Sequence, residues 1–296
     1  MIRSGAMMPG ICDGFDDILL NFRLLGAGLP PLAGWLAAAL WGLLVGSFAT
    51  VAMERWPALI EGRLPAGALW YPGSRCPPCG RPLSWLQAMP LIGWLLSRGR
   101  CPCGRQAVPA RYPLVELGGM VFILAAALLA PPPLDRVVMT VLVASALYLL
   151  AVVDARAGYL PDALTLGLLW AGLLAAGLAP CGLDAIDAGD AIAGAATGWL
   201  VMALVGTIAR LRLGREGLAR GDWKLVAAIG AWGGIEAVFQ LLLLGSVAAL
   251  LLSPLLARFH MAEDADAPRG VPLGPGFALA ALPILAGAVP SLPILG

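Results

Sequence analysis

Long apolar runs, separated by short polar segments, follow one another along most of the chain. Several of these runs hold roughly 18–22 residues, the length that a helix needs to cross a hydrocarbon core of about 30 Å. The pattern predicts an all-α polytopic membrane protein with about eight transmembrane helices. The predicted spans are residues 32–53, 114–130, 137–153, 163–180, 189–209, 224–237, 238–257 and 276–295.

The apolar run over residues 225–257 is too long for a single span. Its roughly 33 residues would extend about 50 Å as one helix, whereas the hydrocarbon core is only about 30 Å thick. Gly233 and Gly234, followed by Glu236, provide a point at which the helix can break. We therefore expect a tight hairpin of two helices in this part of the chain.

Composition agrees with a membrane protein and narrows the function classes. The chain has 296 residues, of which 60% are hydrophobic and 12% are charged, and its mean hydropathy is +0.86. Soluble domains hold about 25% charged residues. The net charge is +1, and no basic stripe with interleaved aromatic residues is present. The lipid bilayer is therefore an expected partner and nucleic acid is not.

Basic residues gather in alternate loops, and this sets the expected orientation. Eight arginines lie between the first two predicted spans, and four arginines together with Lys224 follow the fifth. Because cytoplasmic loops of membrane proteins are enriched in Lys and Arg, we place both loops in the cytoplasm and both termini outside. This topology brings Asp154, at the end of the third span, and Asp222, before the sixth, to the same membrane face.

The topology divides the chain into four regions. Residues 1–31 form an N-terminal extension to which we assign no function, and residues 32–53 form the first transmembrane helix. Residues 54–113 form a small cytoplasmic Cys-rich domain, and residues 114–296 form the remaining transmembrane domain. The Cys-rich domain is too short to build a good hydrophobic core of its own.

Two pairs of cysteines lie in this cytoplasmic domain. Cys76 and Cys79 form a CxxC motif, and Cys101 and Cys103 form a CxC motif. In a reducing compartment this arrangement favours a tetrathiolate zinc site over disulfides, and the metal would hold the short domain together. Free thiols without a metal and a redox-active CxxC motif are the alternatives.

The carboxylates are the remaining candidates for catalysis. His260 is the single histidine and has no evident Ser or Cys partner, so a nucleophilic triad is not expected. Asp154 and Asp222 could act as an aspartyl pair, in which one carboxylate activates water while the other, protonated, donates to the scissile carbonyl. Alternatively, both are interfacial charges beside Arg156 and Lys224, or both serve proton or ion transport.

Together these motifs resemble the type IV prepilin peptidase family, the bifunctional leader peptidases and N-methyltransferases of type IV pilus and type II secretion systems. The resemblance covers nearly the whole chain from about residue 42. The motifs occur in the expected order. They are GSFATVAMERWP (46–57), CPPC (76–79) with the later Cys pair, RYPLVEL (111–117), DARAGYLPDALTLGLLWAGLL (154–174), ARGDWKLVAAIGAWGG (219–234) and VPLGPGFALAA (271–281).

The resemblance implies an activity and the residues that carry it. Asp154 and Asp222 would be the catalytic pair of a GxGD-type membrane aspartyl protease, and residues 114–296 would form its peptidase domain. Zinc bound by the cysteines would be structural. Asp162, in the sequence LPD, is a competing acid, but its turn-like Pro-Asp setting favours a helix-capping role.

Substrates and location also follow from the resemblance. The family cleaves prepilins and pseudopilins after the Gly that ends a short basic leader, at the cytoplasmic face of the bacterial inner membrane. It then methylates the new N-terminal amine with S-adenosylmethionine. We expect the loop acids Glu54, Glu61 and Glu116 to attract the basic leader. Gly99 and residues 111–116 are the candidates for the methyl-donor site.

Two departures from the family pattern keep other hypotheses open. Ala219 stands where the family has the first Gly of GxGD, and the second Cys pair is one residue short. Both features support a catalytically inactive, zinc-stapled membrane scaffold for pilus or secretion assembly. A transporter is the third hypothesis, but it predicts acids near the middle of the membrane rather than at one face.

Overall fold

The structure is a computed structural model in which every regular element is a helix. It describes residues 18–20, 24, 26, 31–71, 73–76, 79–101, 106–130, 132–179, 183, 185–213, 219–256 and 272–290. The elements are α2 (Pro31–Ile60), η1 (Ala66–Leu69), α3 (Ile92–Leu96), α4 (Arg111–Leu129), α5 (Leu134–Ala157), α6 (Asp162–Leu178), α7 (Ala188–Leu213), α8 (Arg220–Leu256) and α9 (Gly274–Leu285). Within these residues two isolated bridges are the only β pairing, so the predicted all-α class is confirmed.

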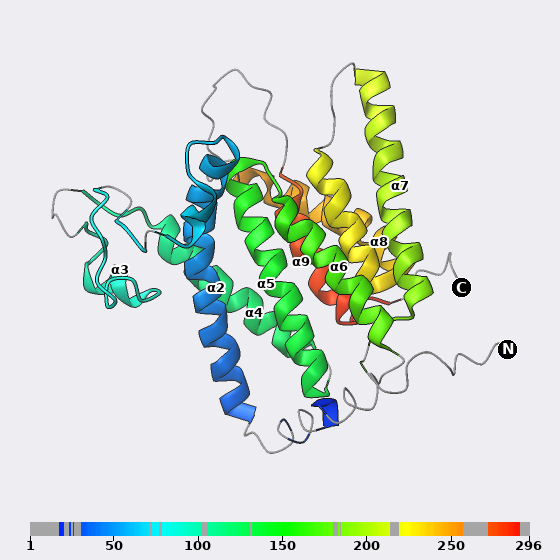
Figure 1. Cartoon of the computed structure of the whole chain (residues 1–296), viewed down its shortest axis with the longest axis horizontal. Helices are drawn as coiled ribbons and strands as arrows, with labels where there is room; N and C mark the ends of the chain where they lie inside the picture. Colours follow the sequence, from blue (N-terminus) through cyan, green and yellow to red (C-terminus); the bar gives the residue numbers. More distant parts are fainter. Residues whose placement is uncertain are drawn as a thin grey trace.

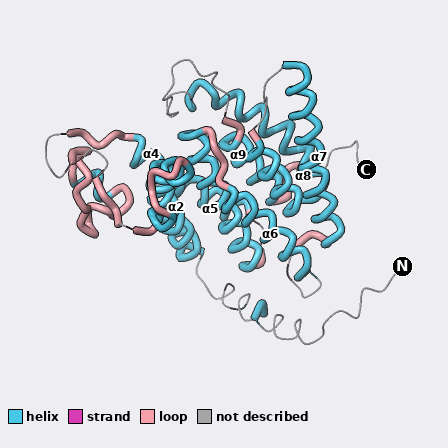
Figure 2. The backbone as a smooth tube through the Cα atoms, turned by 45° about the horizontal axis from the view of Figure 1, so that its top comes forward, coloured by secondary structure: helices cyan, strands magenta, loops and turns pink. Residues whose placement is uncertain are grey.

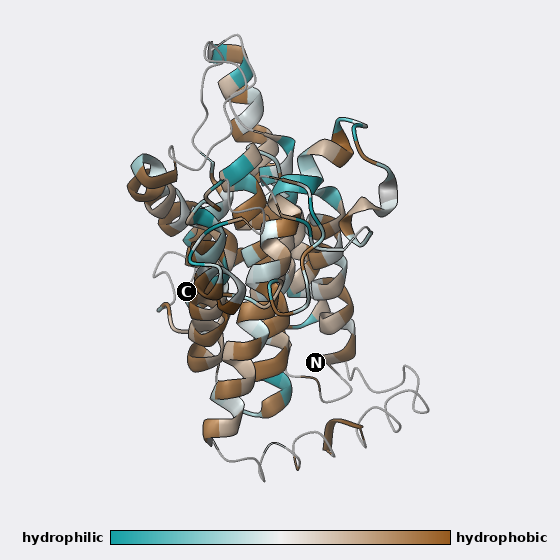
Figure 3. Ribbon diagram, turned by 90° about the vertical axis from the view of Figure 1, so that its left-hand side faces the viewer, coloured by the Kyte–Doolittle hydropathy of each residue, from teal (hydrophilic) through white to brown (hydrophobic). Residues whose placement is uncertain are grey.

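Five helices are long and apolar enough to cross a membrane, namely α2, α4, α5, α7 and α8, while α6 and α9 are shorter apolar helices. Hydrophobic residues cover the bundle along most of its length, and hydrophilic residues gather toward one end (Figure 3). The prediction of a polytopic membrane protein is confirmed. Eight spans remain a prediction. Helix α2 continues to Ile60, past residue 53 where we expected the first span to end.

Helix α8 is broken where the sequence predicts it. Gly234 has φ 74° and ψ −168°, a backbone conformation outside the helical region that glycine tolerates. A Cβ placed on Gly230 would lie 2.9 Å from Cγ2 of Val238. In an unbroken helix these residues would be about 12 Å apart along the axis. The chain therefore folds back on itself after Gly234, as the predicted hairpin requires.

The membrane helices form one bundle. Residues 61–110, which we call the Cys-rich segment, project from it. Helices α2, α4 and α5 lie beside one another, and α8 packs against α6, α7 and α9 (Figure 1). The loops of the Cys-rich segment, with the short helix α3, extend from the side of the bundle formed by α2 and α4 (Figure 2). The bundle and the projecting segment thus meet along α2 and α4.

Small residues let α2 and α4 approach closely. A Cβ placed on Gly46 would lie 2.7 Å from Cα of Glu116, and one on Gly119 would lie 2.6 Å from the carbonyl oxygen of Gly42. Glycine at such crossings permits direct backbone contact between membrane helices. This contact fixes the side chains of Ser47 and Glu116 next to each other at the base of the Cys-rich segment.

Candidate active site and cysteine cluster

Asp154 lies in the last turn of α5, and its side chain is buried, with 4% of the residue exposed. The helix ends at Gly158, which adopts the left-handed conformation typical of a helix C-terminus and donates its N–H to the carbonyl oxygen of Asp154. The backbone N–H of Gly274, the first residue of α9, donates to Oδ2 of Asp154 at 2.8 Å. The carboxylate is therefore held between the end of α5 and the beginning of α9.

Asp222 lies in the first turn of α8 and is also buried, with 6% of the residue exposed. The preceding Gly221 packs against Leu160, because a Cβ at Gly221 would lie 2.9 Å from Cβ of Leu160. Ala219, which replaces a family glycine, is exposed and has no positive φ. Alanine is compatible with that backbone, so the substitution does not distort the turn and gives the scaffold hypothesis no support.

The structure brings the two aspartates together. The charge of Asp154 acts directly on the carboxyl group of Asp222, although the residues are far apart in sequence. The neighbouring bases have other carboxylate partners, since Arg156 pairs with Glu54 at 3.6 Å and Lys224 pairs with Asp162 at 2.5 Å. This arrangement is that of two buried, interacting carboxyl groups, and it differs from two interfacial charges that are each neutralised by the adjacent base.

The predicted capping role of Asp162 is wrong. The N-cap residue of α6 is Pro161, and no side-chain hydrogen bond caps this helix end. Asp162 is the first helical residue, where its charge is favourable near the helix N-terminus. Its side chain is 54% exposed and pairs with Lys224. Asp162 is therefore an exposed ion-pair partner beside the buried pair.

Gly274 contacts the candidate carboxylate of Asp154 and was not among the residues predicted from the sequence. A Cβ at this position would lie 2.7 Å from Oδ2 of Asp154, so only glycine brings its N–H this close to the carboxylate. From the sequence alone, residues 271–281 are identified only as the last family motif. The sequence feature that could have indicated close contact with Asp154 is the pair Gly274 and Gly276, on either side of a proline at the beginning of an apolar helix.

The cysteines that the structure describes form one cluster. Sγ of Cys101 lies 3.2 Å from Sγ of Cys76 and 3.0 Å from Sγ of Cys79. The first pair sits in a tight turn in which Gly80 has φ 68° and donates its N–H to the carbonyl oxygen of Cys76. Burial raises the pKa of the Cys76 thiol. Cys103 and its turn lie outside the described residues, as does His260.

The cluster has the composition of a metal site. The thiol sulfurs of Cys76, Cys79 and Cys101 all lie within 4.8 Å of one another, and none of the three forms a disulfide. Thiolates about 2.3 Å from a tetrahedral Zn²⁺ would stand at comparable separations. Isolated bridges pair Arg75 with Pro82 and Arg100 with Ala107 beside these cysteines. The cluster could therefore hold a metal ion that joins two otherwise minimal turns.

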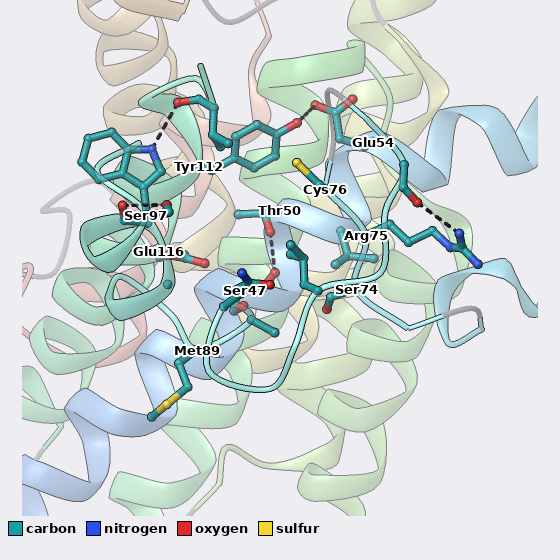
Figure 4. A pocket seen from close by; sticks show the side chains of 18 of the residues that line it. Ser47, Thr50, Glu54, Ser74, Arg75, Cys76, Met89, Ser97, Tyr112 and Glu116 are labelled. Atoms are coloured by element: carbon teal, nitrogen blue, oxygen red, sulfur yellow. Dashed lines mark hydrogen bonds between the residues drawn. The ribbon is translucent and has the colours of Figure 1, made fainter. Parts of the chain in front are cut away.

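Two of the three expected loop acids are not in loops. Glu54 lies in α2 and Glu116 in α4, and both are partly buried, whereas Glu61 is exposed and pairs with Arg63. Glu54 and Glu116 line a cavity of about 450 Å³ between α2, the Cys-rich segment and α4 (Figure 4). We call this cavity the α2–α4 pocket. Neither aspartate of the pair is among the residues that line it.

Comparison with known proteins gives consistent matches over most of the chain. A model of the bacterial peptidase A24 N-terminal domain matches residues 40–130, and a model of the type IV leader peptidase family matches residues 140–253. The prepilin leader peptidase/N-methyltransferase of Klebsiella pneumoniae is 42% identical over 211 residues, which cover 70% of this chain and 89% of the relative. The protein of the same name from Dickeya chrysanthemi is 38% identical over 78% of this chain and 85% of the relative. The one from Pseudomonas aeruginosa is 35% identical over 84% of this chain and 89% of the relative. No solved structure matches the chain at a significant level.

Proposed function

The chain is a member of the type IV leader peptidase family, and we propose that it is a membrane aspartyl endopeptidase acting on type IV prepilins or type II secretion pseudopilins. It would remove the basic leader after its terminal Gly and then methylate the new N-terminal amine. The observation that carries the peptidase assignment is the pair of buried, interacting carboxyl groups of Asp154 and Asp222, at the ends of two helices that both pack against α9.

The pair suits general acid–base hydrolysis. Two buried carboxyl groups at close range cannot both ionise without a large electrostatic cost, so they share one proton. The N–H of Gly274 donates to Oδ2 of Asp154, and an oxygen that accepts this bond carries no proton. We therefore propose that Asp154 accepts this bond as a carboxylate and that Asp222 carries the shared proton. In this state Asp154 can accept a proton from water while Asp222 donates one to the scissile carbonyl.

The proposed orientation places this chemistry at the cytoplasmic face of the bacterial inner membrane. Arg156 follows Asp154, Arg220 precedes Asp222, and the arginine-rich segment between α2 and α4 leads back into the bundle at Arg111. The ion pairs of Glu54 with Arg111 and Arg156 connect α2, α4 and α5 at this end. Basic residues on one side of the bundle support a cytoplasmic location for it.

Two bound groups belong to the proposal. Cys76, Cys79 and Cys101, completed by Cys103, would hold a structural zinc ion that stabilises the Cys-rich segment. S-adenosylmethionine would supply the methyl group: the deprotonated N-terminal amine attacks the methyl carbon, the carbon–sulfur bond breaks, and the sulfur keeps the electron pair. The proton lost by the amine goes to solvent.

The peptidase proposal is tested by cleavage of a model prepilin in membranes. Asp154→Asn and Asp222→Asn preserve side-chain size but remove the shared proton and the charge. We expect each to reduce cleavage by about 10³-fold or more, as removal of an acid–base group at a coupled site does. Each variant must insert at the parent level, as shown by membrane fractionation. If either variant cleaves at the parent rate, the pair is wrong.

A further inference from the structure

The α2–α4 pocket has no part in peptide hydrolysis as described above, yet it is a sizeable cavity where the Cys-rich segment meets α2 and α4. Its volume of about 450 Å³ falls in the range of roughly 300–1,000 Å³ in which small-molecule sites occur. One wall comes from α2 and α4, and the other comes from the Cys-rich segment. The side chains that line it and matter below are Glu54, Met89, Trp94, Arg100, Tyr112 and Glu116.

The pocket is built from fixed groups. The carboxylate of Glu116 accepts the backbone N–H of Leu91 at 2.7 Å and the hydroxyl of Ser47. Leu91 has φ 59°, a left-handed conformation that is rare for a branched apolar residue and that aims its N–H at Glu116. The indole N–H of Trp94 donates to the carbonyl oxygen of Val108 at 3.1 Å, which fixes the ring. The pocket is therefore organised before any ligand enters.

The charges in the pocket have both signs. Glu54 and Glu116 supply two carboxylates, while Arg55, Arg75 and Arg100 supply three guanidinium groups. Arg75 donates to the carbonyl oxygen of Gly80 at 3.1 Å, so it also fixes the first cysteine turn. A strongly basic peptide would meet the arginines as well as the acids. A small molecule that carries charges of both signs matches this lining better.

We propose that the α2–α4 pocket binds S-adenosylmethionine. This inference rests on the proposed methyltransferase function and locates its donor site. The ligand carries a sulfonium, an ammonium, a carboxylate and a flat purine. Glu116 and Glu54 would bind its cationic groups, and Arg100 would bind its carboxylate. The rings of Trp94 and Tyr112 would pack against its apolar and cationic surfaces.

The wall of the pocket is connected to the aspartate pair. Glu54, which lines the pocket, accepts a hydrogen bond from Tyr112 at 3.2 Å and pairs with Arg156 at 3.6 Å. Arg156 stands two residues after Asp154 on α5. The donor site and the hydrolytic site thus share α2 and the end of α5. An amine released beside Asp154 would have a short path to the pocket.

The test measures equilibrium binding of radiolabelled S-adenosylmethionine to the full-length, metal-loaded protein in lipid nanodiscs. The variants are Glu116→Gln, which keeps an oxygen for the N–H of Leu91, and Arg100→Gln, an exposed side chain whose loss leaves folding intact. The matched controls are Glu61→Gln and Arg81→Gln, an acid and a base of the same segment that do not line the pocket. Prepilin cleavage by the parent protein is measured in parallel.

We expect Glu116→Gln to weaken binding by at least about tenfold and Arg100→Gln by about fivefold, the loss of one charge-assisted hydrogen bond each. Glu61→Gln and Arg81→Gln should bind within about twofold of the parent, as exposed charges do. The double variant Asp154→Asn/Asp222→Asn should still bind, because neither aspartate lines the pocket.

Three outcomes would overturn the inference. In the first, both pocket variants bind like the parent, so the donor site is elsewhere. In the second, the parent cleaves prepilin but binds no S-adenosylmethionine, which removes the methyl-transfer part and leaves the peptidase intact. In the third, Glu116→Gln weakens binding of a basic leader peptide and not of S-adenosylmethionine, which makes the pocket a leader site.

Discussion

The helical bundle and the Cys-rich segment, residues 61–110, hold their functional groups by different means. In the bundle, Asp154 and Asp222 are buried among apolar side chains contributed by several helices. In the Cys-rich segment, Trp70 and Trp85 are each more than three-quarters exposed, and η1 and α3 are the only helices in its described part. The bundle is stabilised by apolar packing, whereas we propose that the segment depends on metal binding by its cysteine cluster.

Because the two regions are stabilised differently, we expect that prepilin cleavage and methyl transfer can be disrupted separately. A change at a helix contact in the bundle should disturb the aspartates and leave the segment folded. A change at the cysteines should unfold the segment and leave the bundle intact, because a metal that joins short turns contributes directly to their folding.

Gly274→Ala should disturb the position of Asp154 in the bundle. The added methyl group would lie 2.7 Å from Oδ2 of Asp154 and displace either α9 or the carboxylate. We expect prepilin cleavage to fall by about 100-fold, or about 2.7 kcal/mol of transition-state free energy. Binding of S-adenosylmethionine should remain, and the protein should still insert.

The matched control for that change is Gly177→Ala in α6, where a Cβ meets no atom within 4 Å. It should cleave like the parent. Equal activity of Gly274→Ala and Gly177→Ala would show that the hydrogen bond from residue 274 does not position Asp154.

Removal of the proposed metal should unfold the Cys-rich segment. Cys76→Ser, or extraction of zinc by a chelator, should make residues 61–110 at least about tenfold more sensitive to a soluble protease, since the segment loses the free energy of metal binding. Binding of S-adenosylmethionine should fall with it. The cleavage fragments, mapped by mass spectrometry, should end within the segment, and readdition of zinc should protect the parent. Fragments that end within the helices would contradict independent folding of the bundle.

Gly46→Ala tests the boundary between the two regions. The new methyl group would lie 2.7 Å from backbone atoms of Glu116, which cannot rotate away. We expect a loss of about 1–3 kcal/mol of stability from overpacking, measured as a lower Tm in detergent. Gly34→Ala in the same helix meets no atom within 4 Å and should be neutral or slightly stabilising. Equal Tm values for the two variants would argue against close α2–α4 packing.

Much of the bundle could be predicted from the sequence because its signals are local. Apolar run length located the membrane helices, and the pair Gly233–Gly234 located the break in α8. Cysteine spacing predicted a cluster, and three of its four members lie together in the described residues. Charge bias in the loops predicted that Asp154 and Asp222 lie at the same end of the helices, and their carboxyl groups interact in the structure.

The rest could not be predicted because it depends on contacts between distant segments. Nothing near Asp154 in the sequence indicates that Gly274 donates to it, 120 residues away. Sequence proximity suggested that Lys224 accompanies Asp222, but helix packing directs Lys224 to Asp162. The prediction of Glu116 as a loop acid is wrong, because Glu116 lies within α4 and lines the pocket. Such pairings follow from how the helices pack, which hydropathy does not encode.

Asp162→Asn should have the smallest effect, and it compares an exposed carboxylate of the bundle with the buried pair. Asp162 and Lys224 form an ion pair whose carboxylate is 54% exposed. Exposed pairs contribute about 0–1 kcal/mol, so we expect a small decrease in Tm and prepilin cleavage within about twofold of the parent. Asp162→Asn is also the matched control for the buried pair, because it removes the same charge beside the same helix. If it abolished cleavage while Asp154→Asn or Asp222→Asn did not, the catalytic acid would be the exposed aspartate, and burial would not be the property that selects the active carboxylates.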